Sequence, residues 1–182
     1  MLDRLEDAIQ AVVQGRMVVI VDDESRENEG DLVVAAELIT PEIVNFMITE
    51  GRGLICAPMD GSIVARLGLR PMVSEFENSD PKGTAYTVSV DADALVSTGI
   101  SAADRARTIR MLAAQDSKPD DFRRPGHVFP LAARSGGVLV RAGHTEASVD
   151  LMRFAGLRPA AAICEILNPD GTMMRLGGLR EF

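Results

Sequence analysis

At 182 residues with 46% hydrophobic side chains, the chain fits one domain, residues 1–182, that buries about 70% of the surface of its unfolded form. The formal net charge of -8 argues against a nucleic-acid or anionic-membrane partner, because such surfaces select an excess of Lys and Arg. Two cysteines far apart in sequence, Cys56 and Cys164, predict neither a zinc module nor a disulfide framework, and favour a reducing, cytoplasmic setting.

The first residues predict an amphipathic helix, because apolar side chains recur at helical spacing and Gly15 follows them as a C-terminal stop. The apolar face consists of Leu2, Leu5, Ile9, Val12 and Val13. The same segment is charged where a signal peptide has an apolar core, and no apolar stretch approaches the ~20 residues that span a bilayer. We therefore expect neither export nor membrane insertion.

An acidic segment, residues 22–31 (DDESRENEGD), lies between two apolar runs at 17–21 and 32–36 that predict buried strands. Gly30 precedes the second run and indicates a sharp turn. Two like charges about 4 Å apart repel by about 4 kcal/mol at an effective dielectric near 20, so carboxylates gathered in one pocket need a cation, a proton or a charged ligand. A divalent metal would meet this need, although acids pointing outward from a solvated loop would give the same pattern.

A calcium-binding EF-hand loop is excluded by its register. If that loop began at Asp23, Asn28 would stand where the motif needs glycine, and Val34 would stand where it needs a bidentate glutamate. The acidic segment therefore calls for another kind of site.

The middle of the chain alternates helical and strand patterns. Thr40-Pro41 predicts a helix start, because a capping residue precedes a proline at the first helical position. This helix is expected to continue to about Glu50. Further predicted elements are a strand at 54–57 that ends at Pro58, a strand at 85–90 and a helix at 101–114. Residues 68–83, broken by prolines and acids, predict either a mobile loop beside the site or an ordinary surface connection.

Two local signals qualify this order. Ser101 to Asp104 resembles a capping box with aspartate in the glutamate position. Arg124-Pro125-Gly126 predicts a turn before His127.

The last third of the chain predicts an anion site. An apolar run at 138–140 predicts a strand, which leads into residues 141–146 (RAGHTE) and a helix to about Ala155, so a strand, a glycine turn and a helix start come together. Free N–H groups and the positive end of the helix dipole attract anions there, and Arg141 and Thr145 add donors.

The final apolar run, 161–167, carries Glu165 in its middle, and burying a lone carboxylate costs several kcal/mol unless it is paired or protonated.

The interleaved strands and helices favour a mixed sheet covered by helices over a sandwich or a bundle.

His144, beside a glycine at a helix start, suits a ligand role. For His127, a structural hydrogen bond is as good an explanation as a functional role. Cys56 fits a small buried hydrophobe better than a catalytic thiol. The nucleophile elbow, the P-loop and the dinucleotide fingerprint are absent. The remaining carboxylates and histidines suit metal-assisted acid/base chemistry on a small phosphorylated substrate.

Five motifs in order make the chain strongly similar to the 3,4-dihydroxy-2-butanone 4-phosphate synthases of riboflavin biosynthesis over nearly its whole length. They are residues 22–31 (DDESRENEGD), 99–105 (GISAADR), 124–130 (RPGHVFP), 141–146 (RAGHTE) and 163–165 (ICE). The resemblance implies an α+β fold, a three-layer α/β/α sandwich with a mixed twisted β-sheet. It also implies a lyase that converts D-ribulose 5-phosphate to 3,4-dihydroxy-2-butanone 4-phosphate and formate with magnesium, or manganese in its place. The family is homodimeric, with sites near the subunit interface.

Residue roles carried over from the family fall into three groups. The implied metal ligands are Glu27 and His144. The implied substrate-binding residues are Arg26, Glu27, Asp31, Arg141, Ala142, Gly143, His144, Thr145 and Glu165. The residues implied in turnover are His127 and Glu165, with Asp31 or Glu29 as the base that forms an enediol before water loss, a carbon shift and formate release. Which carboxylate moves which proton is left open.

One departure and two alternatives accompany the resemblance. Family members usually continue with a further helix and strand, so we expect the chain to be short at its C-terminus, with effects on a sheet edge or the dimer contact. An RNA-modifying relative would show a basic face, which the net acidity opposes. A metal-dependent phosphatase or aldolase acting on sugar phosphates would use the same residues.

Overall fold

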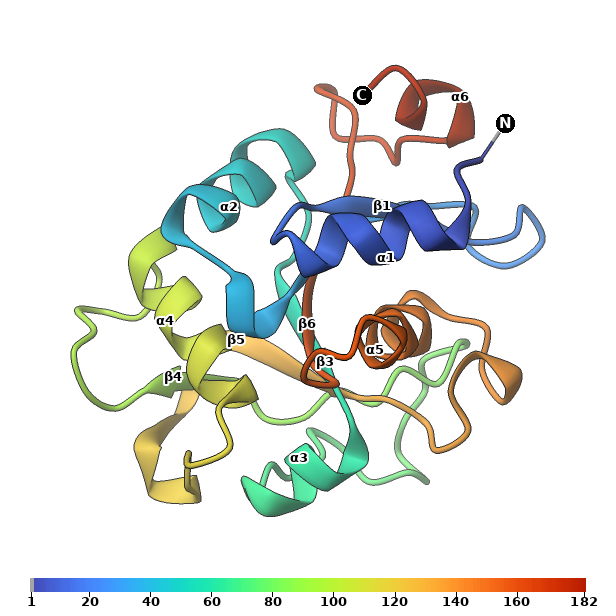
Figure 1. Ribbon diagram of the computed structural model, residues 1–182. Helices are drawn as coiled ribbons and strands as arrows, with labels where there is room; N and C mark the ends of the chain where they lie inside the picture. Colours follow the sequence, from blue (N-terminus) through green and yellow to red (C-terminus); the bar gives the residue numbers. More distant parts are fainter. Residues whose placement is uncertain (1) are drawn as a thin grey trace.

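A six-stranded mixed sheet with helices on both faces is the frame of the molecule in the computed structural model, which describes residues 2–182 (Figure 1). The strand order is β1-β2-β6-β3-β5-β4. The strands are β1 (Val18–Val21), β2 (Gly30–Ala35), β3 (Cys56–Met59), β4 (Val90–Ala92), β5 (Phe122–Ala132) and β6 (Ala161–Glu165). The β3–β5 pair is parallel, whereas β1–β2, β2–β6, β3–β6 and β4–β5 are antiparallel. The predicted α+β class with a mixed sheet is confirmed.

Helices form a layer on each face of this sheet. They are α1 (Leu5–Val13), α2 (Pro41–Phe46), α3 (Gly61–Arg66), α4 (Ala102–Ala113), α5 (His144–Phe154) and α6 (Leu176–Leu179). Short turns of other helix types lie at Ala36–Leu38, Met47–Gly51, Pro119–Asp121 and Gly137–Leu139. None of the helices described combines the length and the hydrophobicity that a membrane-spanning helix requires.

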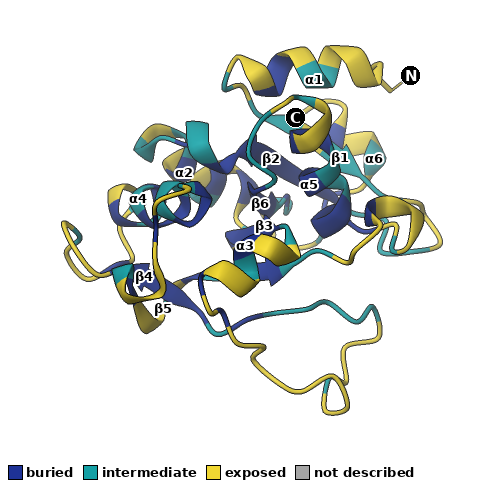
Figure 2. Cartoon of the chain, turned by 60° about the horizontal axis from the view of Figure 1, so that its bottom comes forward, coloured by how far each residue is buried: buried dark blue, intermediate teal, exposed yellow. Residues whose placement is uncertain are grey.

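Alternation along β2 explains the three layers. Leu32 and Val34 pack in the cluster that includes α2 and α4, whereas Val33 and Ala35 pack in the cluster that includes α1 and α5. Successive strand residues point to opposite faces, so one fully buried strand supplies both cores. Figure 2 shows the central strands β2, β3 and β6 as buried among helices that carry exposed residues.

Helix starts follow the predicted caps with one difference. The Thr40 hydroxyl accepts the N–H of Ile43 at 3.3 Å, and the Ser101 hydroxyl accepts the N–H of Asp104 at 3.1 Å. The Asp104 carboxylate does not complete the predicted capping box, because it accepts hydrogen bonds from Ser97 and Gly99 instead. It thereby fixes the loop before α4.

The first helix is less buried than its apolar face predicts. It ends as expected, with Gly15 at φ +73°. Within α1 only Ala11 and Val12 are buried, while Leu5 and Val13 are half exposed. The apolar pattern sets the helix, but α1 covers only the edge of the sheet.

The turn in the acidic segment lies at Asn28, not at the predicted Gly30. Asn28 has φ +57°, whereas Gly30 is the first residue of β2 and pairs with Val21 of β1. The glycine is needed for space, since a Cβ there would lie 2.5 Å from a methyl carbon of Leu179. The acidic residues therefore cap a β-hairpin, and Asp31 belongs to a strand.

Two proline-containing segments are strands where punctuation was expected. Pro58 lies inside β3, where the β3–β6 bridges at Cys56 and Met59 share one register and the ladder between them is interrupted. A missing N–H accounts for such an interruption. The predicted turn at Arg124–Gly126 lies within β5, opposite a register shift between Val90 and Asp91 of β4, so the signal marks a bulge.

Two predicted strands are only partly regular or not regular at all. Residues 85–88 pair with β5 through an isolated bridge between Tyr86 and Leu131, and only Val90–Ala92 forms a strand. Residues 138–140 are an exposed turn, in which Leu139 is 95% exposed. Gly136 and Gly137 both adopt positive φ before this turn, which breaks the extended backbone that the apolar run predicted.

Candidate active site

A polar cavity lies where the β1–β2 hairpin loop, the C-terminal end of β6 and the N-terminus of α5 meet. Eight of the eleven predicted site residues line it: Arg26, Glu27, Glu29, Asp31, Arg141, His144, Thr145 and Glu165. Ala142 and Gly143 contribute backbone beside it, and His127 lies outside it. The sequence therefore predicted most of the residues that the fold brings together here.

Asp22 holds the hairpin loop in shape through hydrogen bonds to its side-chain carboxylate. Its carboxylate accepts the N–H groups of Glu27 at 3.0 Å and Glu29 at 2.9 Å and a side-chain hydrogen bond from Arg26 at 3.0 Å. Partial burial opposes ionisation, but the hydrogen bonds from Glu29, Arg26 and Glu27 hold the pKa of Asp22 below its usual value. The loop therefore has a fixed shape built around one ionised acid.

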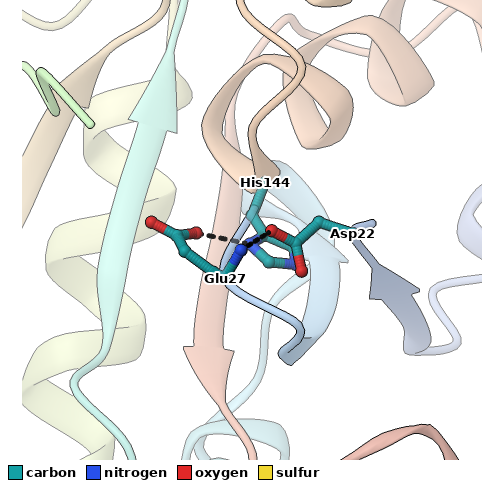
Figure 3. A group of neighbouring side chains, drawn as sticks. All are labelled: Asp22, Glu27 and His144. Atoms are coloured by element: carbon teal, nitrogen blue, oxygen red, sulfur yellow. Dashed lines mark hydrogen bonds and ion pairs between the residues drawn. The ribbon is translucent and has the colours of Figure 1, made fainter. Parts of the chain in front are cut away.

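His144 is the first residue of α5 and points toward this loop (Figure 3). Its Nδ1 lies 3.6 Å from Oε2 of Glu27 and 3.9 Å from Oδ1 of Asp31. Burial lowers the pKa of His144, and the nearby carboxylates of Asp22 and Glu27 oppose this only in part. The imidazole is therefore neutral near pH 7 and keeps a lone pair for a ligand.

The residues around His144 fit a divalent cation. Ligand atoms of Asp22, Glu27 and His144 all lie within 4.8 Å of one another. Among the described residues, the buried Nε2 of His144 has no hydrogen-bond partner. The Asp22 oxygens already accept three hydrogen bonds, so Glu27 and His144 are more available than Asp22 as ligands for a metal ion. Asp22 was not predicted at this site, and only its place at the start of the acidic run indicated it.

Asp31 and Glu165 form a second acidic pair at the cavity wall. Asp31 is 3% exposed, and within the described chain its Oδ1 has no hydrogen-bond partner. Burial raises the pKa of Asp31 well above its usual value, and the charges of Glu165 and Glu29 raise it further. Burial and the charge of Glu27 likewise raise the pKa of Glu29, against the opposing charge of Arg175. Asp31 and Glu29 therefore bind protons more readily than ordinary carboxyl groups.

The isolation of Glu165 inside an apolar strand is not observed. Glu165 is the last residue of β6, is only partly buried, and accepts the N–H of Leu54 at 2.8 Å. The strand ends where the cavity begins, so this carboxylate has a backbone partner and access to the cavity.

Two arginines converge on the start of α5. A Cβ at Gly143, the residue before the helix, would lie 2.5 Å from Nη1 of Arg141 and 2.8 Å from Nη2 of Arg26. Lys82 approaches from the predicted loop, and its Nζ donates to the carbonyl of Arg26 at 2.6 Å. Cationic groups and the free N–H groups of a helix start thus share one place, which suits an anion.

His127 lies apart from this cavity in the described chain. Its Nδ1 is 2.7 Å from Oδ2 of Asp91, its N–H donates to the same carboxylate at 2.9 Å, and its side chain is 42% exposed. The structural hydrogen bond considered for His127 is therefore present. The imidazole of His127, on β5, is nevertheless exposed, whereas its partner Asp91, on β4, is buried.

Sequence reasoning missed several residues at the cavity. Thr84, Tyr86 and Leu131 line it and lie outside the five motifs, and Ile163, which lies inside the 163–165 motif, was not predicted to line the site. Cys56 also lines it and is buried, and burial raises the pKa of its thiol. The thiol is therefore protonated, as expected of a small hydrophobe.

Together, the sandwich fold and the cavity define an α/β/α protein with a candidate divalent-metal site next to an anion site. The chain belongs to the 3,4-dihydroxy-2-butanone 4-phosphate synthase family, whose sequence model matches residues 6–182.

Curated relatives carry riboflavin-biosynthesis names. The chain is 58% identical over 180 residues to riboflavin biosynthesis protein RibBA of Aquifex aeolicus, covering 98% of this chain and 44% of that protein. It is 56% identical over 178 residues to the monofunctional riboflavin biosynthesis protein RIBA 2, chloroplastic, of Arabidopsis thaliana, covering 98% of this chain and 37% of the relative. The chain thus spans less than half the length of these relatives.

Solved structures share the fold. RibBX of A. baumannii, a two-domain 3,4-dihydroxy-2-butanone 4-phosphate synthase, superposes with TM-score 0.94 at 47% identity, over 99% of this chain and 52% of that one. A 3,4-dihydroxy-2-butanone 4-phosphate synthase in complex with two magnesium ions gives TM-score 0.88 at 53% identity, over 96% and 82%. A cation-free form gives 0.92 at 48% identity, over 100% and 89%.

Proposed function

We propose that this chain is a lyase that converts D-ribulose 5-phosphate to (S)-3,4-dihydroxy-2-butanone 4-phosphate and formate in riboflavin biosynthesis. The observation that carries the proposal is the meeting, at one cavity, of a candidate metal pair, a buried proton-binding acid and two arginines at a helix start. Family membership supports the same reaction.

Glu27 and His144 would hold Mg²⁺, or Mn²⁺ in its place. The support is the neutral imidazole of His144, whose Nε2 has no hydrogen-bond partner among the described residues and whose Nδ1 lies 3.6 Å from Oε2 of Glu27, and a related structure that contains two magnesium ions. Bound there, the ion supplies a Lewis acid for the carbonyl and hydroxyl oxygens of the sugar. Asp22 keeps the loop in shape by holding the Glu27 and Glu29 N–H groups.

The substrate phosphate would lie at the start of α5. Arg26 and Arg141 supply charge, Thr145 supplies a hydroxyl, and Ala142 and Gly143 supply backbone that can approach closely because Gly143 has no side chain. Arginine forks match phosphate oxygens in geometry as well as in charge. The carbons of a sugar anchored there would lie in the cavity that Asp31 also lines.

Asp31 is the group best suited to take the proton from the carbon beside the carbonyl, which gives an enediol. Asp31 lines the cavity, its Oδ1 has no partner among the described residues, and its raised pKa brings proton binding toward the working pH. Glu29, with a raised pKa, and Glu165, held by the Leu54 N–H, line the same cavity and serve the later proton transfers. Burial of Asp31 keeps water away from the proton it carries.

The working unit would be a homodimer with sites near the interface. His127 is implied in turnover, yet in this subunit its exposed side chain lies outside the cavity. In the proposed homodimer, a second copy would present His127 to this cavity, so that each site is shared between two subunits. Two unpaired, buried thiols support the cytoplasmic setting predicted from the sequence, although the Arabidopsis relative is named as chloroplastic.

The reaction is tested by incubating the protein with ribulose 5-phosphate and Mg²⁺ and analysing the products. Formate together with the four-carbon phosphate supports the lyase. Release of inorganic phosphate would instead indicate a phosphatase, and a shorter aldehyde would indicate an aldolase; either result without formate overturns the proposal.

A further inference from the structure

We infer that Glu146 is a positioning residue that holds Arg141 in the orientation that binds the substrate phosphate, an inference that rests on the proposed function. Glu146 lies on α5 one turn after Gly143 and is 1% exposed. Its Oε2 accepts a hydrogen bond from Nη1 of Arg141 at 2.7 Å. A carboxylate this deeply buried is stable only when it is paired, and Arg141 is its charged partner.

The guanidinium of Arg141 is held at three of its nitrogen atoms. Besides Nη1, its Nε donates to the carbonyl of Lys82 at 3.0 Å, and its Nη2 donates to the hydroxyl of Thr84 at 2.9 Å. A guanidinium carries five N–H groups, so two remain, one on each terminal nitrogen. Because Arg141 lines the cavity, this is the arrangement expected for a fork that presents its last donors to an anion.

Glu146 also connects two segments that are distant in sequence. Its Oε1 accepts the N–H of Arg134, just after β5, at 2.9 Å, while its Oε2 faces Arg141. Only a carboxylate can accept on both sides. If glutamine replaced this glutamate, the amide oxygen would satisfy one partner, and the NH₂ group would face the other donor.

Charge and geometry predict opposite effects, which makes the inference testable. If Glu146 acted only as a negative charge near the phosphate, removing that charge would strengthen anion binding. If it positions Arg141, removing or shortening the carboxylate frees the guanidinium and weakens anion binding. Misplacement of a binding group by about 1 Å costs on the order of 10²-fold in related situations, so we expect geometry to dominate.

The test measures the Kd for inorganic phosphate by calorimetry, and KM and kcat for ribulose 5-phosphate, in the whole chain. We expect Glu146→Gln and Glu146→Asp each to raise the phosphate Kd and the KM about tenfold, with kcat within about threefold of wild type. The Asp variant keeps the charge but is one methylene too short, so it separates reach from charge. Unchanged or tighter phosphate binding in both variants overturns the inference.

Asp150→Asn is the matched control. Asp150 lies one turn later on the same helix, accepts the N–H of Val138 at 2.9 Å and pairs with Arg153 at 2.6 Å, but does not line the cavity. It should cost stability as Glu146→Gln does and leave the phosphate Kd unchanged. An equal rise in Kd for Asp150→Asn would mean that any hydrogen-bonded acid on α5 has the effect, and would also overturn the inference.

A double-variant cycle covers the case in which Glu146 variants fold poorly. Thr84→Val keeps the shape of the side chain and removes the hydroxyl that holds Nη2, so it should weaken phosphate binding in the same direction. In an Arg141→Ala background, Glu146→Gln should add little to the phosphate Kd, because the residue acts through Arg141. If Glu146→Gln raises the phosphate Kd by the same factor with and without Arg141, Glu146 does not act through Arg141.

The proposed reaction and the positioning role of Glu146 are contradicted by different results. A wild-type chain that binds phosphate but releases no formate removes the proposed reaction and leaves the Kd comparison decisive for Glu146. A wild-type chain that releases formate while the Glu146 variants match it removes only the positioning role. A wild-type chain that binds no phosphate overturns the inference.

Discussion

Asp31 and Glu165 lie directly opposite each other on the antiparallel strands β2 and β6. Opposed side chains in such a pair have Cβ atoms about 5 Å apart, so their charges repel when both are ionised. Burial and this neighbour together raise the pKa of Asp31. The strand register itself therefore prepares one acid to carry a proton while Glu165 accepts the N–H of Leu54.

Stability of the metal-free protein should fall as the pH rises above the usual range of an aspartate. The folded-state pKa of Asp31 lies above its unfolded value. Its contribution is therefore fully present below the unfolded pKa and is lost as the pH rises through the folded value. Asp31→Asn should flatten this slope and raise the melting temperature at pH 8 in EDTA. Thermal melts from pH 4 to pH 8 check this, and an unaltered slope contradicts it.

Asp31→Asn should also abolish most turnover, because an amide cannot take a proton from carbon. General-base contributions are about 10² to 10⁴-fold, so formate release should fall by at least about 10²-fold. Progress curves of formate production measure it. Activity within a few fold of wild type would assign the base to Glu29 or Glu165.

The two histidines give a matched pair for the metal site. His144→Ala should weaken Mg²⁺ binding at least about tenfold, because it removes one of the two available donors. His127→Ala should bind Mg²⁺ as the wild type does, since His127 lies with Asp91 away from the cavity. Calorimetric titration of both variants decides, and equal affinities would remove His144 from the site.

A mixed dimer tests whether the His127–Asp91 dyad serves a neighbouring cavity. His127→Ala and His144→Ala should each be inactive alone. When they are mixed and allowed to exchange subunits, one of the two sites in each heterodimer would combine an intact His144 with an intact His127. Activity should then return, and its failure to return in verified heterodimers would argue for action within one subunit.

Arg175 should tune metal affinity from outside the cavity. Its guanidinium donates to the carbonyls of Glu27, at 2.9 Å, and Asn28, which fixes the hairpin loop against the segment before α6. Arg175→Ala should weaken Mg²⁺ binding severalfold and cost at most about 1 kcal/mol of unfolding free energy, because the side chain is exposed. Arg180→Ala, a nearby exposed arginine, is the control for lost charge.

Gly143→Ala should impair substrate binding without unfolding the chain. The backbone at φ -114°, ψ 162° accepts any residue, but the new Cβ would displace the guanidinium ends of Arg141 and Arg26. We expect KM for ribulose 5-phosphate to rise about tenfold with a melting temperature near that of wild type. Gly177→Ala is the control, because a Cβ there meets nothing within 4 Å. Equal KM values would show that the phosphate lies elsewhere.

Much of the fold and most of the candidate site could be predicted from the sequence. Apolar periodicity located α1, α2, α4 and α5 and the strands β1, β2, β3 and β6, but not most of β5. The caps at Thr40 and Ser101 lie where the motifs placed them. Turn signals were less reliable. Gly30 does not form the turn. Its missing side chain leaves room for Leu179, near the end of the chain, to pack against it. The segment around Pro125 became a bulge because β4 pairs on both sides of it.

An acidic segment between two strands, a glycine-flanked histidine and a helix start that follows Arg141 could be recognised from the sequence, because caps, turns and periodicity depend on neighbours along the chain. Tertiary structure alone decided which acid is buried, which nitrogen of His144 is unpartnered and that Glu146 holds Arg141. Burial and Coulomb interactions depend on groups from other strands and helices. No local pattern records the distance between residue 31 and residue 165.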